Sequence, residues 1–257
     1  MFELASTPSD LGEILVQGYR LGLQAFRRLF MLTSLIAFLG IVPTACLVWG
    51  AGDVPISWTY MLEHSRGGYG LAGILVLLVT LLLRALLLNR IAAAAHGRTE
   101  TLGVELRKAA HVWLWLLAAI IVYALAVLFG MVLLVVPGLI LAVSLCFWDF
   151  GVVLEGLGPI NALNASHNLV WGHWWRTLGL FLLIFLPLSV LVAIVAAMLG
   201  LDLGSMSDTA ATGRSVFGQT VLEMVVGAVF GPFIYSIFYV YYHDLKLRKQ
   251  NTGDKPG

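Results

Sequence analysis

Long apolar runs alternate with shorter segments that carry charge along the whole chain. Each run covers about 18 to 24 residues, the length that a helix needs to cross a hydrocarbon layer of about 30 Å. The alternating pattern typical of barrel strands is absent from the sequence, so the spans are expected to be helices, which satisfy their own backbone hydrogen bonds in lipid. The pattern predicts six spans, at about 29–50, 70–91, 112–135, 138–155, 177–199 and 218–241.

The composition also indicates a membrane protein. Of the 257 residues, 60% are hydrophobic and 11% are charged, which is too little polar surface to cover a water-soluble protein of this size. The predicted fold class is therefore all-α, a polytopic helical membrane protein. We expect a single integral membrane domain over residues 1–245 and a flexible cytoplasmic tail over residues 246–257.

Arginine and lysine gather on one side of the predicted spans. Thirteen of the 15 basic residues fall on the side of both termini, and only Arg66 and Arg214 fall on the opposite side. Because cytoplasmic loops carry the excess of basic residues, both termini are expected in the cytoplasm. The formal net charge of +1 gives no long-range field to attract nucleic acid, so no nucleic-acid partner is expected.

Three segments on the predicted cytoplasmic side combine a helical apolar stripe with polar positions: residues 7–30, 101–117 and 156–183. We interpret them as amphipathic helices that lie in the headgroup layer. Each precedes two spans, which indicates a threefold repeat of one interfacial helix and one hairpin. In the first segment, Thr7 is expected to cap the helix and Pro8 to be its first residue.

Only a short corner, Val136-Pro137-Gly138, separates the third predicted span from the fourth. Pro137 disfavours helical geometry at Val136, and Gly138 accepts backbone angles that a branched residue resists. The two spans are therefore expected to form a tight hairpin that turns at this corner.

The stretch LLVVPGLILAVSL, followed by VVLEGLGPINALNASHNLVWGHWW and another long span, resembles the YciC-like bacterial inner-membrane proteins. It is also similar to the related membrane domain found in some glycerophosphodiester phosphodiesterases. The resemblance is best over Trp113–Leu183. The residues that match the family pattern are Pro137, Gly138, Glu155, Gly156, Ala162, Leu163 and Ser166.

The resemblance implies a polytopic helical fold in the inner membrane of a bacterium and a role in envelope or membrane homeostasis. It does not imply phosphodiesterase activity, because no segment outside the predicted spans is long enough to form the catalytic domain of those relatives. Asp149 lies outside the pattern that the family shares.

Three charged residues that lie away from the cytoplasmic ends of the predicted spans form a candidate intramembrane polar site: Arg84, Asp149 and Glu223. Arg84 and Asp149 are expected at similar depth, where an ionisable group points to a functional site, so they are a plausible ion pair. In the alternative, Arg84 extends to the headgroups and a water or hydroxyl satisfies Asp149. Glu223 either faces the bundle interior, where it would handle protons or cations, or simply reaches water.

Two pairs of glycines have helical spacing and predict close helix packing: Gly18 with Gly22, and Gly227 with Gly231. The second pair precedes Pro232, so a smooth face and a local bend fall together. Another span of the same chain and a second copy are both candidate partners for this face.

No motif for a catalytic site, a cofactor or a metal emerges from the sequence, since the six histidines lack metal-ligand spacing. We therefore expect a non-enzymatic inner-membrane protein of envelope or lipid homeostasis that contacts or moves phospholipid. A membrane scaffold that binds another membrane protein or itself is the first alternative. A small-solute transporter, supported by the weak repeats, is the second.

Overall fold

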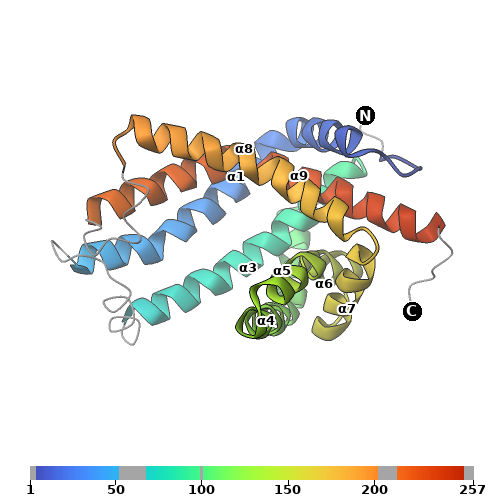
Figure 1. The fold of residues 1–257 in the computed structure, drawn as a ribbon, viewed down its shortest axis with the longest axis horizontal. Coiled ribbons are helices and arrows are strands. Elements are labelled where there is room, and N and C mark those ends of the chain that lie inside the picture. The colour runs from blue at the N-terminus through green and yellow to red at the C-terminus, as the bar shows by residue number, and fades with distance from the viewer. Residues whose placement is uncertain (1–3, 52–67, 99–100, 202–212, 252–257) are drawn as a thin grey trace. The chain divides into compact units, whose positions relative to one another are not determined.

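The computed structural model describes residues 4–51, 68–98, 101–201 and 213–251. Over these residues the fold is helical and contains no strand, and six of the helical segments are long and apolar enough to cross a membrane (Figure 1). The helices are α1 (Leu11–Ala51), α3 (Gly68–Ala95), α4 (Leu102–Leu133), α5 (Val135–Ser144), α6 (Trp148–Glu155), α7 (Pro159–Val170), α8 (Trp174–Met198) and α9 (Gly213–Asn251). The prediction of an all-α protein with six spans is confirmed.

Two of the predicted interfacial helices are continuous with the spans that follow them. In α1 and α4 no proline or turn separates the predicted interfacial segment from the apolar run, so the helical hydrogen bonding continues. Only α7 is separate from its span, because Gly172 has a φ of 92° and turns the chain before α8. The members of the predicted threefold repeat thus differ from one another.

The ends of the first and last helices differ from the sequence prediction. Helix α1 begins at Leu11, after Thr7 and Pro8, and Glu13 accepts a hydrogen bond from the backbone N–H of Asp10 at 3.2 Å. This contact is one half of a capping box, which explains the later start. Helix α9 continues to Asn251, so residues 246–251 of the predicted flexible tail are helical.

The hairpin between α4 and α5 turns at Leu134, before the predicted corner. Leu134 is extended, with φ −164° and ψ 148°, whereas Val136 and Pro137 already belong to the first turn of α5. Pro137 was predicted to disfavour helical geometry at Val136, but Val136 is helical, because a proline is tolerated in the first turn of a helix, where its missing N–H would have no partner. A Cβ on Gly130 would lie 2.9 Å from the Cα of Gly138, so this glycine pair lets the two arms approach closely.

The predicted span 138–155 is interrupted in the middle. Helix α5 ends at Ser144 and α6 begins at Trp148, with a non-helical turn between them. The side chain of Ser166, on α7, accepts a hydrogen bond from the backbone N–H of Phe147 and donates one to the carbonyl oxygen of Ser144, both at 3.0 Å. Ser166 therefore satisfies backbone groups that the break releases, as a helix break at membrane depth requires.

The chain forms two compact units, each of which we describe by itself. Unit 1 comprises Met1–Leu29, Leu81–Leu183 and Pro232–Gly257, and unit 2 comprises Phe30–Thr80 and Ile184–Gly231. Within unit 1, α5, α6 and α7 all contact α4 (Figure 1). The largest fully buried side chains of the described residues belong to unit 1, among them Ile14, Leu87, Leu116, Leu180 and Tyr241.

Unit 2 exposes large apolar side chains. Met31, Leu71 and Met198 are exposed to 73%, 68% and 82%. Such a surface is unfavourable in water and suits contact with lipid chains, so it agrees with membrane-spanning segments.

The four predicted packing glycines lie where α1 meets α9. In unit 1, a Cβ on Gly18 would lie 2.5 Å from the Cα of Ile237, and one on Gly22 would lie 3.2 Å from the Cα of Phe233. In unit 2, Gly231 faces Thr33 and Gly227 faces Ala37. The packing partner of these glycines is therefore a helix of the same chain.

Candidate functional site

Arg84 on α3 and Asp149 on α6 form an ion pair within unit 1, which we call the membrane pair. The Nε of Arg84 donates a hydrogen bond to Oδ2 of Asp149 at 2.9 Å. The Asp149 side chain is 1% exposed and the Arg84 side chain 37% exposed, and the guanidinium lies 5.8 Å from the ring centroid of Tyr235. This geometry corresponds to the ion pair, one of the two arrangements that the sequence left open.

Local structure positions Asp149 for this contact. The break before Trp148 places Asp149 in the first turn of α6, where the positive end of the helix dipole favours a carboxylate. The second oxygen of the carboxylate, Oδ1, accepts a hydrogen bond from the backbone N–H of Phe150 at 3.0 Å. A buried charge of this kind needs a partner of opposite charge and hydrogen bonds, and Asp149 has both.

The residues of the resemblance pattern hold α6 and α7 together. Ala162 and Leu163 are buried on α7, and a Cβ on Gly151 would lie 3.3 Å from the Cβ of Ala162. Gly156 ends α6 with a φ of 67°, a conformation that favours glycine. Glu155 accepts a hydrogen bond from the Tyr242 hydroxyl and pairs with the ammonium of Lys246, which ties the end of α6 to α9.

Glu223, the third member of the predicted intramembrane site, belongs to unit 2. It is exposed and accepts a hydrogen bond from Gln219, one turn earlier in α9, at 3.3 Å. Arg84 and Asp149, in contrast, both belong to unit 1.

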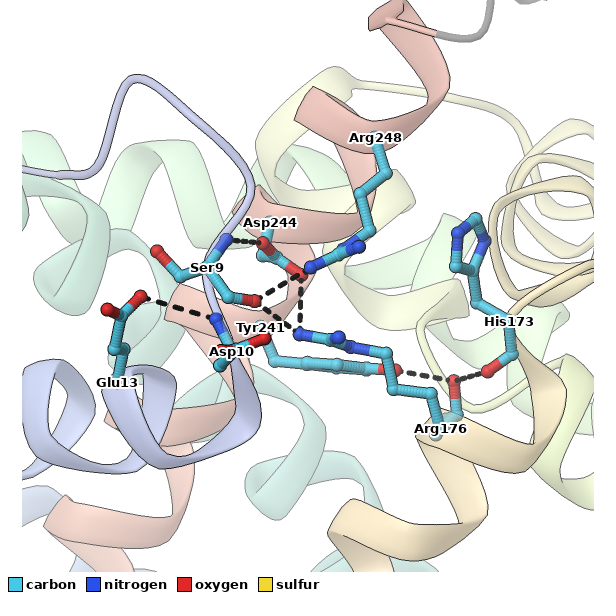
Figure 2. Close-up of polar contacts among 9 residues, drawn as sticks. Ser9, Asp10, Glu13, His173, Arg176, Tyr241, Asp244 and Arg248 are labelled. Carbon is cyan, nitrogen blue, oxygen red and sulfur yellow. Dashed lines mark hydrogen bonds and ion pairs between the residues drawn. The ribbon is translucent and has the colours of Figure 1, made fainter.

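A second polar cluster joins the start of α1, the start of α8 and the end of α9, as Figure 2 shows. We define this helix-end cluster as Ser9, Arg176, Asp244 and Arg248. Asp244 accepts hydrogen bonds from the backbone N–H of Ser9 at 2.7 Å, from Nε of Arg248 at 2.8 Å and from Nη2 of Arg176 at 3.4 Å. The carbonyl oxygen of Ser9 accepts hydrogen bonds from both guanidinium groups.

The helix-end cluster connects the segment before α1 to α8 and α9, and it has an excess of positive charge. Its one carboxylate is 4% exposed and faces two arginines, so the cluster carries a net charge of +1. Next to it, the hydroxyl groups of Thr177 and Tyr241 lie 2.9 Å apart and are buried. These contacts fix the segment before α1 against α8 and α9.

His173 lies beside this cluster, in the turn before α8 (Figure 2). Its Nδ1 is buried and has no hydrogen-bond partner in the part of the chain that the structure describes. Burial lowers the pKa of His173 from its ordinary value of 6.5, and the charges of Arg248 and Arg176 lower it further. The folded protein therefore favours the neutral imidazole.

We expect acidification to destabilise the protein through His173. Because the pKa of this histidine is lower in the folded state, the unfolded state binds more protons once the pH falls below about 6.5. The melting temperature in detergent should therefore decrease between about pH 7.5 and about pH 5.5, and His173→Gln should flatten that decrease. His111→Gln, on an exposed position of α4, is the matched control; an equal flattening there would contradict the assignment.

A further ion pair joins α3 to α4. Nε of Arg90 donates to Oε2 of Glu105 at 2.7 Å, and Nη1 of Arg90 donates to the carbonyl oxygen of Arg28 on α1 at 3.3 Å. The pair lies within unit 1, as do the helix-end cluster and the contacts of Glu155. All three connect helix ends that were predicted, from the distribution of arginine and lysine, to lie on the side of the termini. Three acids at these ends, Asp244, Glu105 and Glu155, form ion pairs with basic side chains.

Sequence reasoning missed most of these contacts. Asp244 and Arg248 have the spacing of a helical ion pair, which was an available signal. No local signal connects Ser9 to Asp244, which is 235 positions away, or Ser166 to the break before Trp148. Among the described residues, no group of three histidine, cysteine or acidic side chains could hold a metal ion.

A family model described as a domain of unknown function, DUF7847, matches residues 65–245 of the chain. That range contains both residues of the membrane pair and, from the helix-end cluster, Arg176 and Asp244. No curated protein and no solved structure matches the chain.

Proposed function

The chain belongs to the family defined by this domain of unknown function, DUF7847, and on that premise we propose that it is a non-enzymatic protein of membrane lipid homeostasis. It contacts phospholipid headgroups through the gathered helix ends of unit 1. The membrane is the inner membrane of a bacterium, and both termini lie in the cytoplasm.

One observation carries the proposal: the helix ends expose apolar and basic side chains next to each other, while Glu105, Glu155 and Asp244 are paired with basic side chains. On α4, Leu102 and Leu106 are 67% and 49% exposed, and Arg107 is exposed beside them. Trp175, at the start of α8, is 79% exposed. An apolar surface rimmed by positive charge suits the boundary between acyl chains and anionic headgroups.

The proposed location, a bacterial inner membrane with both termini in the cytoplasm, is based on the distribution of basic residues and on the resemblance to YciC-like proteins. The excess of arginine and lysine on the side of the termini favours the cytoplasm for that side. The resemblance to YciC-like inner-membrane proteins over Trp113–Leu183 lies inside the range that matches the family model and supports a bacterial inner membrane and a role in envelope homeostasis.

The scaffold alternative loses part of its support. Its sequence basis included the two glycine pairs as a docking face, yet α1 and α9 use these glycines for each other. The transporter alternative depended on the threefold repeat, whose first two members lack a separate interfacial helix.

Purification from native membranes in mild detergent tests the proposal. We expect phospholipid to remain bound, with anionic species enriched relative to the surrounding membrane when the retained lipid is quantified by mass spectrometry. A stoichiometric protein partner and no retained phospholipid would support a scaffold and reject the lipid role.

A further inference from the structure

We propose that a cavity between α1, α3 and the start of α4 binds the phosphate group of an anionic phospholipid; this inference rests on the proposed function and specifies where the headgroup is held. The cavity has a volume of about 280 Å³ and lies entirely within unit 1. Three arginines line it, Arg28, Arg90 and Arg98, together with a single acid, Glu105. We call it the arginine cavity.

Short side chains create the space. The last turn of α3 contains four successive alanines, residues 92–95, and Ala93 and Ala94 line the cavity. Ala25, on α1, also lines the cavity. Because each of these side chains ends at Cβ, they leave a volume between α1 and α3 that larger residues would fill.

The end of α3 positions Arg98 at the cavity. Gly97 has a φ of 64°, its N–H bonds to the carbonyl oxygen of Ala94 at 3.1 Å, and the N–H of Arg98 bonds to that of Ala93 at 2.8 Å. These two bonds form a Schellman motif, which ends the helix with a defined geometry. The backbone of Arg98 is thus held in place although its side chain is exposed.

The acid in the lining positions an arginine and does not repel the ligand. Glu105 is 6% exposed on its side chain and pairs with Nε of Arg90, whose Nη1 bonds to the carbonyl oxygen of Arg28. Arg90 is therefore held in a fixed orientation. With Glu105 neutralised, Arg28 and Arg98 leave the cavity with an excess of two positive charges, and neither pairs with an acid among the described residues.

The chemistry of the lining selects phosphate. Guanidinium groups present parallel N–H donors that match phosphate oxygens, and several of them around one small cavity favour a compact anion. The volume suits a headgroup and is too small for acyl chains, which would remain in the bilayer. The cavity therefore serves to hold a lipid at the surface.

Binding of defined lipids to the purified full-length protein tests the proposal. The probe is dioleoylphosphatidylglycerol, with dioleoylphosphatidylcholine as the neutral comparison, measured by native mass spectrometry in detergent. The double variant Arg28→Gln/Arg98→Gln should bind phosphatidylglycerol at least about tenfold more weakly than the wild type, because it loses two charge-assisted contacts. The matched control, Arg20→Gln/Arg27→Gln, removes the same charge from exposed positions of α1 outside the lining and should bind within about twofold of the wild type.

A second variant removes space and keeps the charge. Ala94→Leu should also weaken phosphatidylglycerol binding by about tenfold, since its side chain occupies the cavity. Unchanged binding by Ala94→Leu, or equal losses in the cavity and control double variants, would overturn the arginine cavity and leave the proposed function intact. Equal binding of both lipids to the wild type would instead reject the anionic-lipid role itself.

Inorganic phosphate distinguishes the two sources of the ligand. Phosphate added at millimolar concentration should displace phosphatidylglycerol weakly, because the lipid is also held by its chains in the surrounding detergent. Binding of inorganic phosphate as tight as that of phosphatidylglycerol, lost in Arg28→Gln/Arg98→Gln, would overturn the lipid assignment and indicate a soluble phosphate ligand.

Discussion

Asp149→Leu is expected to lower the free energy of unfolding by about 3–5 kcal/mol, because it leaves the charge of Arg84 without its buried partner. The Asp149 side chain is almost completely enclosed and its Oδ2 lies 2.9 Å from Nε of Arg84, so leucine at this position removes a close partner of the guanidinium. Equilibrium unfolding in mild detergent measures the difference. The remaining contact of Arg84 with the ring of Tyr235 is too weak to compensate.

The double variant Arg84→Met/Asp149→Leu should recover most of this loss. Apolar residues of similar volume often replace a buried ion pair at little cost, since neither charge then needs desolvation. Glu223→Leu is the matched control, because it also exchanges an acid for leucine in a predicted span but at an exposed position, and it should change stability by less than about 0.5 kcal/mol. If Asp149→Leu alone were neutral, or the double variant were no better than the single one, the membrane pair would not be a coupled unit.

Gly18→Ala should destabilise the protein by about 3 kcal/mol. The added Cβ would lie 2.5 Å from the Cα of Ile237, so the backbones of α1 and α9 must separate to admit it. Two other glycines of α9 and α1 serve as comparisons for Gly18. Gly227 faces Ala37 at 3.7 Å, an ordinary contact distance, and Gly12 has nothing within 4 Å of its added Cβ.

Alanine substitutions at these two glycines are the controls for Gly18→Ala. Gly12→Ala should be neutral or stabilise by about 0.5–1 kcal/mol, because alanine loses less conformational entropy in a helix than glycine. Gly227→Ala should also be tolerated. Equal melting temperatures for Gly18→Ala and Gly12→Ala would show that α1 and α9 do not pack at Gly18.

Several features of the candidate site were predictable because they depend on single residues in an apolar context. An acid in the middle of a long apolar run needs a partner, and Arg84 was a basic residue at similar predicted depth. The packing role of Gly18 and Gly22 followed from their spacing on one helix face. The partner helix could not be identified from that spacing, since every span offers an apolar surface.

Other features could not be predicted because they depend on groups far apart in the chain. The break between α5 and α6 has neither glycine nor proline at Leu145, Cys146 or Phe147. Helical propensity alone would continue the helix there, but Ser166 stabilises the break from another helix. The turn at Leu134 likewise differs from the predicted corner, because proline fits the first turn of α5.

The sequence by itself determined the helical class, the six apolar spans and the gathering of basic residues on one side. These properties arise from local hydrophobicity and charge, because each span satisfies its own backbone within the hydrocarbon layer. Only the tertiary structure decided which charges meet, which helix covers each glycine face and where α3, α1 and α4 leave a cavity. Those outcomes depend on the distance and orientation of side chains from separate helices, which no local pattern contains.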